Sequence, residues 1–118
     1  MINRSAVTIR YKEPFVRWIM EADPLPERRL NLSVEDVNKD RTVFLISENE
    51  GEMIVNDADF AAWAKRNYRN IFESELEAWY RDPQLWPKQR SYAVFQRWFD
   101  LEFHGSVVDL DDQPITEY

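Results

Sequence analysis

The chain has 118 residues, of which 44% are hydrophobic and 14% aromatic, so it is large and apolar enough to fold around its own core. It contains no cysteine, which excludes disulfides, thiolate catalysis and sulfur-ligated metals within the chain. Its formal net charge of −7 disfavours general binding to nucleic-acid phosphates and to anionic membranes, because like charges repel.

The first part of the chain predicts a strand and then a helix. From Ser5 to Tyr11 apolar and polar residues alternate, which is the period of a half-buried strand. Pro14 suits the first turn of a helix, and apolar residues recur on one helical face as far as Ala22. Asp23-Pro24 ends this helix, because a residue before proline is pushed out of the helical region. Residues 25–31 are expected to form an irregular connection.

The middle of the chain predicts a short helical turn, a strand and a tight turn. Ser33 is a suitable N-cap for a turn of helix at 34–38. The run 42–46 is almost continuously apolar, which favours a central strand or one covered on both faces. Residues 48–52 predict a turn in which Gly51 adopts a positive φ. Residues 53–55 either form a short returning strand, the interpretation we favour, or pack as a loop.

Two further helices and a last strand are predicted in the C-terminal half. Asn56 is a good N-cap for a long helix that runs to about residue 81. Residues 87–105 predict a second helix with an aromatic face, which Pro87 begins and Gly105 closes as a left-handed C-cap. We expect residues 106–110 to form a strand and 113–118 to form a flexible tail.

This order of elements predicts a single α+β domain over residues 1–118. Its sheet is expected to be small and mixed, with three or four strands, and to be covered mainly on one face by three main helices. The first two strands are joined through a helix, so we expect them to be parallel by a right-handed crossover. The apolar strand at 43–46 is placed in the centre.

The inventory of catalytic residues is short. Gly51 and Gly105 are the chain's two glycines, so a glycine-rich phosphate loop or dinucleotide fingerprint is excluded. The single histidine, His104, together with the absence of cysteine, excludes zinc sites of the His/Cys kind within one chain. No serine lies in the Gly-x-Ser-x-Gly elbow that would pair with His104 in a hydrolase. We expect no cofactor.

Two glutamates, Glu75 and Glu102, interrupt the apolar faces of the two long predicted helices. A buried carboxylate needs a partner, or it takes up a proton. Two arrangements are possible. In the first, each glutamate lies at the edge of its helix face and meets an arginine such as Arg10, or a Trp or Tyr donor. In the second, the two carboxylates meet each other. Two adjacent carboxylates could bind a hard cation or act as an acid–base pair. His104, near the predicted helix end, is a further catalytic candidate.

Acidic residues are concentrated in two blocks, one between residues 48 and 59 and one near the C-terminus. Such blocks are typical of a solvated surface, and they also fit an acidic face that binds a basic partner. Two tryptophans fall outside the apolar stripes, and an exposed one would mark a contact surface. The predicted partner-binding residues are Glu48, Glu50, Glu52, Asp109, Asp111, Trp63 and Trp86.

Several short motifs follow one another in the C-terminal half. They are Trp79-Tyr80-x-Asp82, Leu85-Trp86-Pro87, Phe95-x-x-Trp98-Phe99, Glu102-x-His104 and Val108-Asp109-Leu110. In these motifs the chain resembles small acidic bacterial proteins of uncharacterised function, and the resemblance implies no activity. In composition alone it is similar to immunity proteins that neutralise basic toxins, a likeness that assigns no residue.

These patterns favour a cytoplasmic protein-binding or regulatory module whose acidic face meets a basic protein. No apolar run approaches the roughly 20 residues that span a bilayer, and the N-terminus lacks the apolar segment of a secretory signal. We therefore expect neither a membrane nor a nucleic-acid partner, and we favour a non-enzymatic role. The alternative is a small enzyme or metal-binding protein that uses Glu75 and Glu102 as paired carboxylates.

Overall fold

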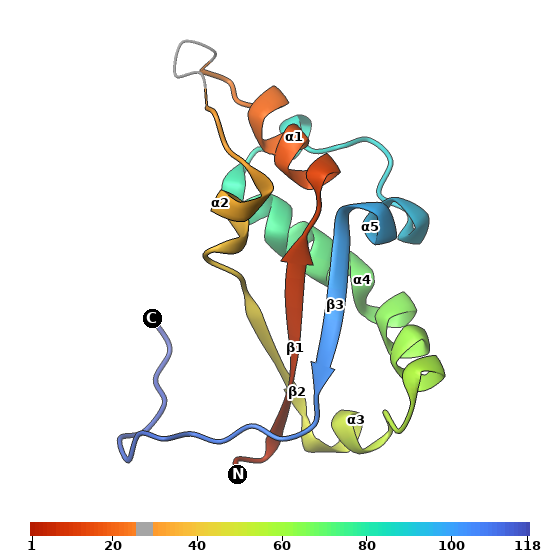
Figure 1. Ribbon diagram of the computed structural model, residues 1–118, viewed down its shortest axis with the longest axis vertical. Helices are drawn as coiled ribbons and strands as arrows, with labels where there is room; N and C mark the ends of the chain where they lie inside the picture. The colour runs from red at the N-terminus through yellow and green to blue at the C-terminus, as the bar shows by residue number, and fades with distance from the viewer. Residues whose placement is uncertain (26–29) are drawn as a thin grey trace.

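The computed structural model describes residues 1–25 and 30–118 (Figure 1). In chain order the elements are β1 (Arg4–Tyr11), α1 (Glu13–Glu21), α2 (Val34–Asn38), β2 (Val43–Ser47), α3 (Glu48–Glu52), α4 (Asp57–Trp79), the 3₁₀ turn η2 (Pro83–Leu85), α5 (Tyr92–Trp98) and β3 (Phe99–His104). The predicted α+β class is confirmed, with a three-stranded sheet and three main helices, α1, α4 and α5. The predicted connection at 25–31 lies largely outside the described residues.

The strand order is β2-β1-β3, and both pairs are antiparallel. The sheet is therefore antiparallel rather than mixed, and the predicted parallel pairing of the first two strands is wrong, as is the central position of the 43–46 strand. The reason lies in α2, where the Asn38 side chain accepts a hydrogen bond from the Tyr11 amide and donates one to the Tyr11 carbonyl, each at 2.9 Å. This pairing returns the chain to the end of β1, so β2 must run back along it.

One face of the sheet forms the core, and the other is open. Val7 and Ile9 are fully buried, and the register places Phe44 and Phe103 on the same face as Val7. Figure 1 shows α4 crossing behind the sheet, against this core face. On the open face, Val43 and Leu45 of the edge strand β2 are 57% and 49% exposed. The prediction that helices cover mainly one face is confirmed.

The predicted aromatic helix at 87–105 is only partly helical. Helix α5 begins at Tyr92, capped by the Ser91 hydroxyl, and ends at Trp98. From Phe99 the chain is extended and forms β3, whose side chains alternate between the core and the open face. Pairing with β1 decides this outcome, because a strand there satisfies the backbone groups of the second edge of β1.

Several smaller predictions are also wrong. Residues 48–52 form helix α3 rather than a turn, and neither Gly51 nor Gly105 adopts a positive φ. Gly51 is needed instead for close packing, because a Cβ at this position would overlap the Ser5 hydroxyl. Residues 53–55 and 106–110 are not strands.

Within the part of the chain that the structure describes, no helix has the length and apolar content to cross a bilayer.

Candidate functional site

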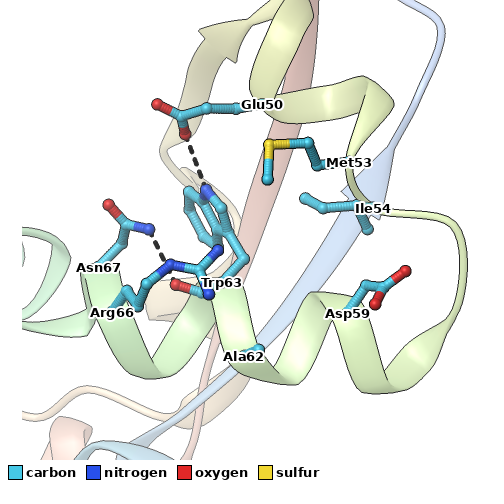
Figure 2. A pocket seen from close by; sticks show the side chains of 8 residues that line it. All are labelled: Glu50, Met53, Ile54, Asp59, Ala62, Trp63, Arg66 and Asn67. Carbon is cyan, nitrogen blue, oxygen red and sulfur yellow. Dashed lines mark hydrogen bonds between the residues drawn. The ribbon is translucent and has the colours of Figure 1, made fainter.

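A cleft of about 480 Å³ lies between helix α3 and the first half of α4 (Figure 2). We call it the α3–α4 cleft. Its lining residues are Glu50, Met53, Ile54, Asp59, Ala62, Trp63, Arg66 and Asn67. It contains two of the predicted partner-binding residues, Glu50 and Trp63. The other lining residues were not predicted from the sequence, because residues 53–55 were interpreted as a strand rather than as the linker that opens this cleft.

The floor of the α3–α4 cleft is the indole of Trp63. The side chain is 4% exposed, and its Nε1–H donates a hydrogen bond to the Glu50 carboxylate at 2.9 Å. Phe60 stacks on the same indole with the ring planes 16° apart. The Asn67 side chain donates to the Trp63 carbonyl at 2.8 Å, as Figure 2 shows. The floor is thus rigid, and it holds Glu50 in one orientation.

The linker between α3 and α4 forms one rim of the cleft and is apolar and exposed. Met53 and Val55 are 70% and 81% exposed. The linker is fixed at its end, because Asp59 accepts a hydrogen bond from the Val55 amide while Asn56 caps the Asp59 amide. An exposed methionine beside an aromatic floor provides a polarisable contact that adapts to different partner side chains.

The charges around the cleft are predominantly negative. Glu48, Glu50 and Glu52 are all exposed on α3, and Asp57 begins α4 next to the same linker. Arg66 is the cation among the lining residues. Of the first acidic block of the sequence, Glu50 and Asp59 line the cleft, and the other carboxylates lie on α3 and in the first turn of α4.

The remaining predicted partner-binding residues do not line the α3–α4 cleft. Asp109 and Asp111 lie in the exposed C-terminal segment, where their carboxylates accept from the amides of Asp111 and Gln113 in local turns. Trp86 is half-buried, and its Nε1–H donates to the Tyr80 carbonyl at 2.7 Å. Neither of the two off-stripe tryptophans is an exposed contact residue in this structure.

Glu75 is buried in α4, with 3% of its surface exposed, and it meets a tyrosine rather than an arginine. The Tyr11 hydroxyl donates to Glu75 Oε2 at 2.8 Å, which is one of the partners expected for it. Among the described residues, Glu75 Oε1 has no hydrogen-bond partner. A buried polar atom left unpaired costs about 1–3 kcal/mol.

The burial of this pair changes the protonation of both groups. Burial raises the pKa of Glu75, and the hydroxyls of Thr42 and Tyr11 oppose the shift. Burial also raises the pKa of Tyr11 to about 12, an effect that the nearby Glu75 charge reinforces. Glu75 lines a second cavity of about 410 Å³, which we call the Glu75 cavity. Its lining residues are Tyr11, Leu32, Asp36, Val37, Asp40, Arg41, Thr42, Glu75, Ala78 and Trp79.

Glu102 and His104 lie on strand β3 rather than on a helix, which corrects the premise of the predicted carboxylate pair. Alternate residues of a strand share a face, so His104 Nε2 lies 3.4 Å from the Glu102 carboxylate and 3.1 Å from the Thr8 hydroxyl. Both groups approach the same ring nitrogen, whereas a hydroxyl–histidine–carboxylate relay uses both nitrogens. The arrangement is a surface contact of the imidazole ring with a carboxylate and a hydroxyl.

The structure does not bring Glu75 and Glu102 together. Glu75 is buried against Tyr11, whereas the Glu102 side chain is 75% exposed and lines a different cavity beside Phe60 and Phe103. Among residues 1–25 and 30–118, no group of three or more potential ligands is placed to hold a metal ion.

Comparisons with known proteins were made by sequence and by structure. No protein-family model matches the chain, and neither the curated proteins nor the solved structures give a match.

Proposed function

We propose that the protein is a cytoplasmic protein-binding module whose α3–α4 cleft receives a basic, amphipathic segment of a partner protein. The observation that supports this function best is that an aromatic floor and an apolar rim meet in one cleft, beside the exposed carboxylates of α3. Met53 and Ile54 supply the apolar rim, and Trp63 supplies the floor. Glu50 and Asp59 are the carboxylates that line the cleft itself.

Each part of the cleft has a separate role in this proposal. Burying the exposed side chain of Met53 and the half-buried side chain of Ile54 supplies affinity, at roughly 25 cal/mol per Å² of apolar area. The carboxylates of α3 steer a basic segment towards the cleft and reject acidic ones. Glu50 enters the complex already oriented by the Trp63 indole, so binding orders fewer side chains.

The overall charge supports the choice of partner. With 22 acidic and 15 basic residues, the chain has no general attraction for nucleic-acid phosphates or for anionic lipid surfaces. A basic polypeptide is the class of macromolecule that the cleft's charge and its apolar rim both fit. The chain has no cysteine and therefore no disulfide, which supports a cytoplasmic location, because disulfides are rare in that compartment.

The proposal is tested with a defined probe, an amphipathic helical peptide of lysine and leucine, which we call the Lys/Leu peptide. We expect saturable binding that weakens as salt is raised from about 50 to about 500 mM, because the ion pairs are exposed and screened. The Glu48→Gln/Glu52→Gln variant is expected to bind the peptide about 3- to 10-fold more weakly, since exposed ion pairs each contribute up to about 1 kcal/mol.

A charge-matched control separates the cleft from the net charge of the protein. Glu48 and Glu52 lie on α3, the helix that supplies Glu50 to the cleft, whereas the Asp109→Asn/Asp111→Asn variant removes the same number of carboxylates from the C-terminal segment. It is expected to bind the Lys/Leu peptide as the wild type does. Equal weakening in both variants, or binding indifferent to salt, would contradict a cleft-specific contact.

A further inference from the structure

The Glu75 cavity is a second concave site that the α3–α4 cleft does not use. It lies at the other end of helix α4, because Glu75 follows Trp63 by twelve residues, about 18 Å along the helix axis. Figure 1 shows helix α2 beside this end of α4, while α3 lies at the opposite end. The two sites have no lining residue in common.

The buried carboxylate of Glu75 has one oxygen engaged and one without a partner. Oε2 accepts the Tyr11 hydroxyl at 2.8 Å, and the Thr42 hydroxyl lies 3.4 Å from the same Tyr11 oxygen. Oε1 has no hydrogen-bond donor among the described residues, although the side chain is 97% removed from solvent. A ligand that brings an N–H donor into the cavity would satisfy Oε1 without disturbing the Tyr11 contact.

The charges and apolar walls of the cavity indicate what kind of ligand would bring that donor. Asp36 and Asp40 line it with Glu75, against the single guanidinium of Arg41, so carboxylates outnumber cations among the lining residues. Trp79 is 39% exposed at the cavity, where its ring can accept a cation on its face. The other apolar lining residues, which would cover an aliphatic stem, are Leu32, Val37 and Ala78.

The wall opposite α4 is held in place by hydrogen bonds of α2. Ser33 and Asp36 form a reciprocal capping box at its first turn, with both bonds at 3.0 Å. Asn38 closes its last turn by bonding the amide and the carbonyl of Tyr11. The cavity is therefore preformed, which lowers the entropy that a ligand must lose on binding.

From these observations we propose that the Glu75 cavity binds an organic cation, a primary ammonium or guanidinium group on an apolar stem. One N–H of the cation donates to Glu75 Oε1, its charge lies against Asp36 and the ring of Trp79, and its stem packs on the apolar wall. The same chemistry is present in free alkylamines and in the lysine and arginine side chains of a partner. This site is independent of the proposed function of the α3–α4 cleft.

The test measures binding of pentylamine, butylguanidine and neutral pentanol by titration calorimetry and NMR. We expect saturable binding of the two cations but not of pentanol. The Glu75→Gln variant is expected to weaken cation binding about tenfold or more, because glutamine carries no charge for the cation to meet. The control Glu77→Gln lies on an exposed position of the same helix and is expected to bind as the wild type does.

A measurement on the wild-type protein keeps the proposal falsifiable if the Glu75→Gln variant does not fold. The side-chain carboxyl carbon of Glu75 is followed by NMR through a pH titration with and without pentylamine. A bound cation favours the ionised carboxylate, so the pKa of Glu75 is expected to fall when pentylamine is present. An unchanged Glu75 titration in saturating pentylamine would overturn the proposal.

A further comparison identifies the source of the cation. The capped tripeptide Gly-Lys-Gly is compared with pentylamine, and the same tripeptide with norleucine in place of lysine is the control. Tighter binding of the lysine tripeptide assigns the cavity to a partner's side chain, and tighter binding of pentylamine assigns it to a free amine. Absence of saturable binding by every cationic probe overturns the proposal. Unchanged amine binding in Glu48→Gln/Glu52→Gln would show that the two sites act separately.

Discussion

At the scale of single residues, the buried Glu75 carboxylate links the stability of the fold to pH. In the unfolded chain its pKa has the ordinary value of 4.5, and burial raises it in the folded chain. The folded chain therefore binds this proton more tightly than the unfolded chain does. The resulting stability is fully present below about pH 4.5 and is lost as the pH rises through the folded pKa.

The first prediction concerns this pH dependence. Glutamine carries no charge at any pH, so the free energy of unfolding of Glu75→Gln relative to the wild type should increase between about pH 4 and about pH 8. Urea unfolding at several pH values measures it, and the exposed Glu77→Gln variant is the control. If the difference in free energy of unfolding between Glu75→Gln and the wild type does not change with pH, the raised pKa of Glu75 in the folded chain is contradicted.

Two other groups that line the Glu75 cavity have pKa values shifted away from this range. The pKa of Tyr11 is raised to about 12, so the phenol stays neutral throughout the range. The pKa of Asp36 is lowered from its ordinary value, chiefly by the hydrogen bond from the Ser33 amide. Glu75 is therefore the lining residue with a raised carboxyl pKa in this range.

A second prediction at this scale concerns Gly51. A methyl group there would overlap the Ser5 hydroxyl, which is buried against α3, so Gly51→Ala should destabilise the fold by about 1–3 kcal/mol. Gly105→Ala is the matched control, because its added methyl meets no atom closer than 3.7 Å. Adding Ser5→Gly to Gly51→Ala should restore part of the loss. Equal stability of Gly51→Ala and Gly105→Ala in urea unfolding would exclude the packing argument.

At the scale of elements, the sequence predicts helices better than it predicts strand partners. The capped helix that begins after Asn56 lies where expected, because its N-cap and its apolar face are local features. The segment 99–104 was misassigned, because Phe95 and Phe99 keep helical spacing while Phe99, Leu101 and Phe103 also alternate as in a strand. Pairing with β1 decides between the two, and a local pattern does not contain that information.

The third prediction tests the element that sets the direction of β2. Asn38→Ala removes both side-chain hydrogen bonds to the backbone of Tyr11 and leaves those half-buried groups unpaired. We expect a loss of about 2–6 kcal/mol in the free energy of unfolding, at about 1–3 kcal/mol for each group. Asn38→Asp keeps the acceptor for the Tyr11 amide but turns a carboxylate oxygen towards the Tyr11 and Val34 carbonyls, so it should not recover the loss. A loss in Asn38→Ala of only a few tenths of a kcal/mol in urea unfolding would argue against this role.

At the scale of the whole molecule, the sites are made by segments that are distant in the sequence. Glu75 was singled out from the sequence because it interrupts an apolar face, and its burial and tyrosine partner agree with one of the two interpretations. Its cavity was not foreseeable, since α2 and Thr42 reach it only through the antiparallel return of the chain. Trp63 was expected at a surface, whereas its contact with Glu50 makes it the buried floor of a cleft.

The most direct test of the central claim follows the indole N–H signals of the five tryptophans while the Lys/Leu peptide is added. Trp63 forms the floor of the α3–α4 cleft, whereas the indole of Trp86 is bonded to the Tyr80 carbonyl outside it. The account predicts that the Trp63 signal shifts in a saturable way and that the Trp86 signal stays in place. A shift of Trp86 without one of Trp63, or no shift at all, would contradict it.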